Sequence, residues 1–168
     1  MSKMNKNIVP EGFTISMALI DGLPVLFFAL MGIFLGIMLN SILFVVGAGV
    51  CFISGALKVL WKIIVVLKRK NVWPLFLQMR IVMPIGFLVI IVSFILACVN
   101  KSIKNLECII NAWSFIFLGI GIIGMILMII FSIKLDSSNP KANWIEQICN
   151  SICQGSFFLA ILIAFLLR

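Results

Sequence analysis

Long runs of apolar residues fill most of this chain, separated by short polar segments. A helix of about 20 residues rises about 30 Å, which matches the thickness of the hydrocarbon core of a bilayer. The pattern therefore predicts an all-α fold, a bundle of five transmembrane helices that forms a single transmembrane domain over residues 1–168. The expected spans are Gly22–Leu39, Ile42–Trp61, Ile81–Val99, Cys108–Ile133 and Ile148–Leu167.

The polar segments between the runs predict how the spans connect. Asn40 and Ser41 alone separate the first two runs, so these should form a tight antiparallel hairpin. The segment 71–80 contains Trp73 and resembles an interfacial stretch, since tryptophan concentrates at the level of the lipid headgroups. The segment 136–140, Asp-Ser-Ser-Asn-Pro, has the composition of a turn.

The fifth run is the least regular. Phe157–Leu167 supplies only 11 strongly apolar residues, about 16 Å of helix, so the rest of a span must come from the polar segment before it. At 100° per residue, Gln147, Asn150 and Gln154 share one face, which should turn toward the bundle because lipid leaves polar groups unsatisfied. The alternative is an interfacial helix followed by a short half-span.

The overall composition agrees with a membrane location. The chain has 168 residues, of which 64% are hydrophobic and 11% charged, whereas a soluble domain is about half apolar and about a quarter charged. Almost no chain remains for a soluble domain. No small-residue cleavage site closes the first apolar stretch, so we expect the first helix to be retained and not removed as a signal peptide.

The charges predict an orientation. The chain has 13 basic and 5 acidic residues, and with the amino terminus inside only Lys101, Lys104 and Arg168 of the basic ones lie outside. The positive-inside rule therefore favours an inner amino terminus and an outer carboxyl terminus. It also explains the net charge of +8 without nucleic acid, and it predicts contact with anionic lipid headgroups at the cytoplasmic face. The abundance of Lys, Ile and Asn suggests a bacterial cytoplasmic membrane.

Small residues recur at helical spacing in the first two spans. Because small side chains let helix backbones approach closely in lipid, these positions are expected to mediate helix packing: Gly32, Gly36, Gly47 and Gly55. The sequence Gly119-x-Gly121-x-x-Gly124 matches a dinucleotide fingerprint by letter only. It lies within a span and follows no strand, so packing is again the expected role.

Charged residues continue the small face of the second span toward its inner end. Asp21 lies about 18 residues before the hairpin turn and Leu60 about as far after it, so Asp21 should be level with Lys58 and Lys62. We predict an ion pair between Asp21 and one of the two lysines, because an isolated charge is costly at that depth. Two interpretations stay open. Asp21 is either the N-cap of the first span, with Lys58 and Lys62 extending to the headgroups, or part of a break between that span and a short embedded piece at 13–20.

Seven polar residues from these segments define a candidate binding site for an ion or a substrate. The set is net basic and should favour an anion or an anionic headgroup. The leading hypothesis is a transporter or channel for an anion or small polar solute, assembled as a homo-oligomer. The alternative is a non-transporting accessory, immunity or lipid-binding protein. The candidate residues are Asp21, Lys58, Lys62, Arg80, Gln147, Asn150 and Gln154.

The chemistry that most enzymes need is scarce here. The chain has no His and no Tyr, and no nucleophile motif, paired-carboxylate motif or phosphate loop is present. We expect no catalytic residues, metal or cofactor, and a lipid-modifying membrane enzyme is the remote alternative. Cys98 and Cys108 flank the second outer loop, where a disulfide is geometrically feasible.

Overall fold

The computed structural model describes residues 14–135 and 140–168, and this part of the chain is helical with no strand. Five of its helices are long and apolar enough to cross a membrane, as the hydrophobic runs predict. Two short helical segments lie between them. The elements are α1 (Ile15–Met38), α2 (Ile42–Lys68), α3 (Trp73–Leu77), α4 (Met79–Val99), η1 (Ser102–Ile109), α5 (Ala112–Lys134) and α6 (Pro140–Leu166).

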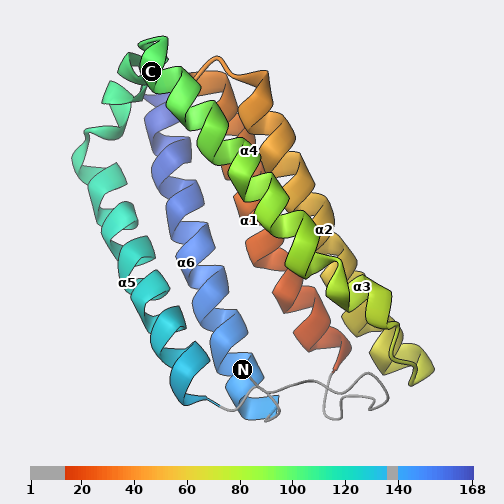
Figure 1. Ribbon diagram of the computed structural model, residues 1–168. Helices are drawn as coiled ribbons and strands as arrows, with labels where there is room; N and C mark the ends of the chain where they lie inside the picture. The colour runs from red at the N-terminus through yellow and green to blue at the C-terminus, as the bar shows by residue number, and fades with distance from the viewer. Residues whose placement is uncertain (1–13, 136–139) are drawn as a thin grey trace.

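The long helices form an open array. Each packs mainly on its neighbours in the order α5, α6, α1, α2, α4, so α5 and α4 are the two edges of this order. In Figure 1, α5 and α6 lie on the left and α4 lies in front of α1 and α2. Phe87 of α4 also makes an edge-to-face contact with Phe28 of α1. Because α6 lies beside α1, the last helix of the chain packs against the first, and α1, α2 and α6 form the centre of the array.

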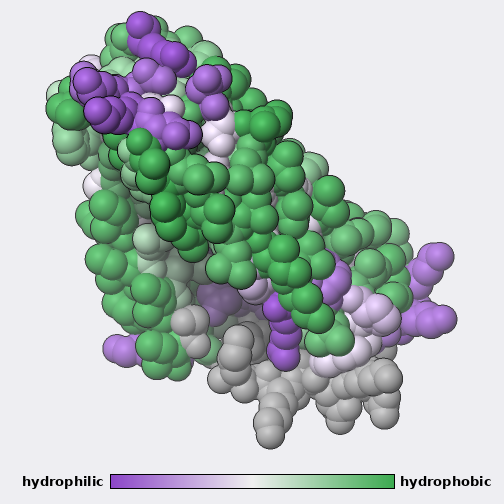
Figure 2. All heavy atoms as spheres, turned by 45° about the horizontal axis from the view of Figure 1, so that its top comes forward, coloured by the Kyte–Doolittle hydropathy of each residue, from purple (hydrophilic) through white to green (hydrophobic). Residues whose placement is uncertain are grey.

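The outer surface has the character of a membrane protein. Large apolar side chains are exposed along all five long helices, for example Leu26, Ile91 and Ile126, each at least half exposed. Figure 2 shows this apolar belt with hydrophilic residues gathered toward the ends of the array. In a bilayer the belt would face lipid tails. Which end faces the cytoplasm remains a prediction from the charges.

The first helix contains Asp21 in its interior, which neither interpretation of that residue allowed. Thr14 is its N-cap, and the Thr14 hydroxyl accepts from the backbone N–H of Met17 at 3.1 Å. The helix then runs without a break through Asp21 and Pro24 to Met38. Asp21 is therefore neither an N-cap nor part of a break, and both expectations were wrong.

Pro24 inside α1 needs an explanation, since proline removes the helical hydrogen bond to the carbonyl four residues earlier. That carbonyl belongs to Ile20. The Ser151 hydroxyl of α6 lies 3.5 Å from its oxygen, but it lies 2.8 Å from the Gln147 carbonyl oxygen, which is the nearer acceptor for its single proton. Hydroxyls of neighbouring helices can re-satisfy a carbonyl that proline frees in a membrane helix, and Ser151 is placed to do so only when its proton turns away from Gln147.

The remaining boundaries differ from the expected spans in informative ways. The helix α6 is continuous from Pro140 to Leu166, so the half-span alternative for the fifth run was wrong. The fourth span begins only at Ala112, because Asn111 caps it by accepting from the Ser114 N–H at 2.9 Å. The hairpin turn at Asn40 is confirmed, with a positive φ of 49°. The turn predicted at 136–140 lies largely outside the described residues.

The predicted glycine packing is confirmed at helix interfaces. Side-chain or backbone atoms of a neighbouring helix occupy the space where a Cβ would stand on each of Gly32, Gly36, Gly47 and Gly55. The closest backbone approach joins α2 and α4: a Cβ on Gly86 would lie 3.0 Å from the Cys51 nitrogen and 3.1 Å from the Gly47 carbonyl oxygen. These two helices therefore pack almost backbone to backbone.

Cysteine pairing and the interfacial segment were the other local expectations. The thiols of Cys98 and Cys108 are free, and Cys108 Sγ donates to the Asn105 carbonyl at 3.2 Å. Trp73 begins the short helix α3 and contacts Phe76, whose ring also packs on Trp61 of α2. The segment after α2 is thus folded back onto it.

Candidate polar binding site

The predicted ion pair is present at the centre of the array. Lys62 Nζ lies 2.9 Å from Asp21 Oδ2, and Lys58 Nζ lies 3.6 Å from the same oxygen. The side chains of Asp21 and Lys62 are only 7% and 5% exposed, whereas that of Lys58 is 31% exposed. Both predicted partners therefore contact Asp21, and the pair with Lys62 is the shorter and the more deeply buried.

The last helix joins this ion pair through Gln147, which is buried. With its side-chain amide oriented to satisfy both atoms, Gln147 Nε2 donates to the Met17 carbonyl at 2.7 Å. Its Oε1 then accepts from Lys62 Nζ, also at 2.7 Å. Gln147 therefore connects α6 to both α1 and α2, and it supplies a second acceptor for the buried ammonium group.

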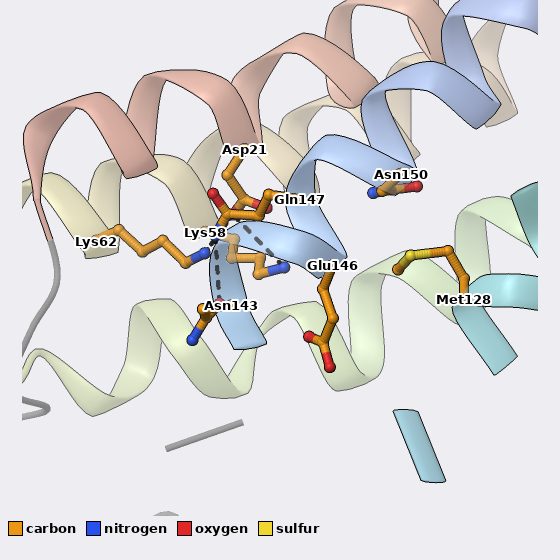
Figure 3. A pocket seen from close by; sticks show the side chains of 8 residues that line it. All are labelled: Asp21, Lys58, Lys62, Met128, Asn143, Glu146, Gln147 and Asn150. Atoms are coloured by element: carbon orange, nitrogen blue, oxygen red, sulfur yellow. Dashed lines mark hydrogen bonds and ion pairs between the residues drawn. The ribbon is translucent and has the colours of Figure 1, made fainter. Parts of the chain in front are cut away.

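A cavity of about 80 Å³ adjoins the ion pair. Figure 3 shows Lys58 and Lys62 reaching toward Asp21, with Gln147 beside it and Glu146 and Asn150 extending from α6. The volume is enough for a few water molecules or one small solute. The lining side chains are those of Asp21, Lys58, Lys62, Met128, Asn143, Glu146, Gln147 and Asn150.

Three lining residues were missing from the expected set: Met128, Asn143 and Glu146. The signal for two of them is present in the sequence. Positions 143, 146, 147 and 150 repeat at three- and four-residue spacing and so share one helix face. The expected set took only Gln147, Asn150 and Gln154 from this helix and left out the neighbouring positions 143 and 146. Nothing in the sequence pointed to Met128, which reaches the cavity from the edge helix α5.

Two expected residues are not part of the lining. Arg80 is exposed at the start of α4, where its guanidinium carbon lies 5.4 Å from the centre of the Phe76 ring. Gln154 lies one turn beyond Asn150 on α6 and is half-buried. With Arg80 outside and Glu146 inside, the cavity has two lysines and two carboxylates. The expected preference for an anion thereby loses its basis.

Beyond Gln154 the same region of the array is filled by aromatic side chains. Phe158, one turn further along α6, stacks on Phe27 of α1 with 5.8 Å between ring centres. Phe34 of α1 contacts both Phe158 and Phe165, at 6.2 and 4.8 Å. The interface between α1 and α6 is therefore polar at the end where α1 begins and aromatic at the end where α6 finishes.

Comparison with known proteins gives no further guide to function, because no family model, curated protein or solved structure matches this chain. Among the described residues, no three Cys, Asp or Glu side chains gather as a metal-binding group. The polar cavity is accordingly the strongest structural guide to a function.

Proposed function

We propose that this chain is a multi-pass membrane transporter or channel subunit that binds a small polar solute in the cavity beside Asp21. The observation that supports this is the concentration of buried polar side chains from α1, α2 and α6 around one cavity. Ionisable groups within membrane helices are costly, and they commonly mark pathways for ions or substrates.

The lining suggests the chemical class of the solute. Lys58 and Glu146 present opposite charges to one cavity, and Asn143 and Asn150 add amide groups that both donate and accept hydrogen bonds. A small zwitterion or a neutral solute rich in hydrogen-bonding groups would satisfy this mixture. An anion would meet two carboxylates as well as two ammonium groups.

A path across the membrane requires more than one copy in this proposal. The five long helices form an open array in which α4 and α5 are the edges, so one chain does not surround a central pore. A symmetric homo-oligomer would enclose a path between copies. The aromatic contacts of Phe27, Phe34 and Phe158 would then separate the cavity from the far side of the membrane.

Osmotic swelling of liposomes that contain the purified protein tests the proposal. Glycine represents zwitterions, glycerol neutral solutes and nitrate anions, and protein-free liposomes give the background rate. We expect glycine or glycerol to enter faster than this background. Asn150→Leu, which places an apolar group of similar size in the cavity, should reduce that rate. Asn105→Leu, on the exposed η1, is the matched control and should leave it unchanged.

The non-transporting accessory protein is the second candidate, and the aromatic packing between α1 and α6 favours it. In that role the polar cluster would only join three helices. Background rates for all three solutes with folded protein would support this candidate and contradict the transport proposal.

A further inference from the structure

A second concave feature lies between α5 and α6, away from the polar cavity. It is an apolar groove of about 410 Å³, lined by Ile120, Leu127 and Phe131 of α5 and by Ile145, Ile148 and Ile152 of α6, among others. At 100° per residue, positions 145, 148 and 152 lie on the side of α6 opposite to positions 143, 147 and 150. The groove and the polar cavity are therefore separate sites on opposite faces of one helix.

The groove has the dimensions of one leaflet. From Ile120 to Phe131 the helix α5 advances about 16 Å, while half of a hydrocarbon core is about 15 Å thick. The ligand that fits a leaflet-long apolar groove on a membrane-facing surface is an acyl chain.

Two lysines mark one end of this groove. Lys134 is the last residue of α5 and follows Phe131 by three positions, and Lys141 precedes Ile145 by four on α6. Residues three and four apart share a helix face, so both lysines lie on the groove side of their helices. Both are exposed. Toward the other end of the groove neither helix carries a charged residue, so the basic residues are confined to one end.

We propose that the α5–α6 groove binds an anionic phospholipid, with one acyl chain in the groove and the phosphate between Lys134 and Lys141. Charge complementarity selects this occupant, since lysines near a headgroup attract anionic lipids specifically. The four-carbon stems of the lysines lie along apolar surface while their ammonium groups reach the phosphate level. The site does not depend on the transport proposal.

Native mass spectrometry of the detergent-solubilised protein tests this site. The probes are phosphatidylglycerol and phosphatidylcholine with identical chains, offered at equal concentration. We expect the protein to retain phosphatidylglycerol in preference. The double variant Lys134→Gln/Lys141→Gln should reduce that preference roughly tenfold or more, because each lysine near the surface contributes about 1 kcal/mol. Lys101→Gln/Lys104→Gln, which removes two lysines at the opposite end of the array, is the charge-matched control.

Further measurements distinguish binding of lipid in the groove from a general attraction between lysines and anionic lipid. Ile148→Trp fills the groove from an exposed position and should weaken binding of both lipids. Glycerol 3-phosphate, which has no chains, should not compete for the site. An unchanged preference in the Lys134/Lys141 variant, or an equal loss in the Lys101/Lys104 control, would overturn the proposal. The lysine variants leave the groove intact, so they decide the question even if Ile148→Trp fails to fold.

Discussion

Removal of the Asp21 carboxylate should be among the most destabilising single changes in this protein. Asp21→Asn keeps the size of the side chain but takes away the counter-ion of two lysines. Lys62, whose side chain is only 5% exposed, would lose its anionic partner at 2.9 Å and keep Gln147 Oε1 as a neutral acceptor at 2.7 Å. An amide oxygen does not neutralise a buried ammonium group, so the loss of the carboxylate would raise the cost of burying that charge.

The geometry sets the order and size of the effects. Asp21→Asn should lower the free energy of unfolding by about 3 kcal/mol, the low end for a broken buried pair. Lys62→Met should lower it by about 2 kcal/mol, because Asp21 keeps Lys58 at 3.6 Å. Lys58→Met should lower it by less than about 1 kcal/mol, since that side chain is 31% exposed. The double variant Asp21→Asn/Lys62→Met should lose at least about 1 kcal/mol less than the two single changes together.

A double-mutant cycle measured by reversible unfolding in mixed micelles checks these values. Far-ultraviolet circular dichroism would report the helix content of each variant, and Lys68→Met, at an exposed helix end, controls for the loss of one positive charge. Additive effects of Asp21→Asn and Lys62→Met would refute the buried pair. So would a larger effect of Lys58→Met than of Lys62→Met, because the distances and exposures predict the reverse.

Three further predictions follow from the packing and the charges. Gly86→Ala should destabilise the protein by about 1–3 kcal/mol, because the new methyl group meets the backbone of α2. Gly49→Ala, with no atom within 4 Å of its Cβ, should be neutral or slightly stabilising. Thermal unfolding of the two variants checks this difference. Ser151→Ala should cost less than about 1 kcal/mol, because the Ser151 hydroxyl donates mainly to the Gln147 carbonyl at 2.8 Å and lies 3.5 Å from the Ile20 carbonyl. Pro24→Ala, which restores a backbone N–H for Ile20, should therefore leave this cost nearly unchanged in the same unfolding assay. A reporter enzyme active only outside the cytoplasm should be active when fused after the carboxyl terminus and inactive when fused after the loop following α2; the opposite result would reverse the orientation.

The depth of the ion pair was predictable because a hairpin fixes it. The turn at Asn40 and Ser41 is too short to let α1 and α2 shift along each other. Counting residues from the turn in both directions therefore places Asp21 level with Lys58 and Lys62. Helical spacing then puts both lysines on the face of α2 that carries Gly47 and Gly55, where Gly55 packs on α1 and Gly47 on α4. Local sequence carried this information because the two helices are adjacent both in the chain and in space.

Other features depended on contacts between distant segments. Pro24 in sequence predicts a helix start, whereas in the structure the helix continues through it and packs on α6, whose Ser151 lies 127 positions later in the chain. The absence of Arg80 from the cavity has the same origin. Its helix packs mainly on α2 and lies at the edge of the array, away from α6, and nothing local to residue 80 encodes that order.

The order of the helices nevertheless has a correlate in their polar content. The spans that lie at the edges, α4 and α5, have no charged residue between Ile81 and Val99 or between Ala112 and Ile133. The central helices α1, α2 and α6 hold all the charged residues of the cavity. An edge helix has lipid on most of its sides and few positions that could satisfy a charge, whereas a central helix has protein on two sides. Intramembrane charge therefore identifies the centre of this array. The helix α6 has the lowest mean hydropathy of the five spans, and it is polar because it lies between α1 and α5.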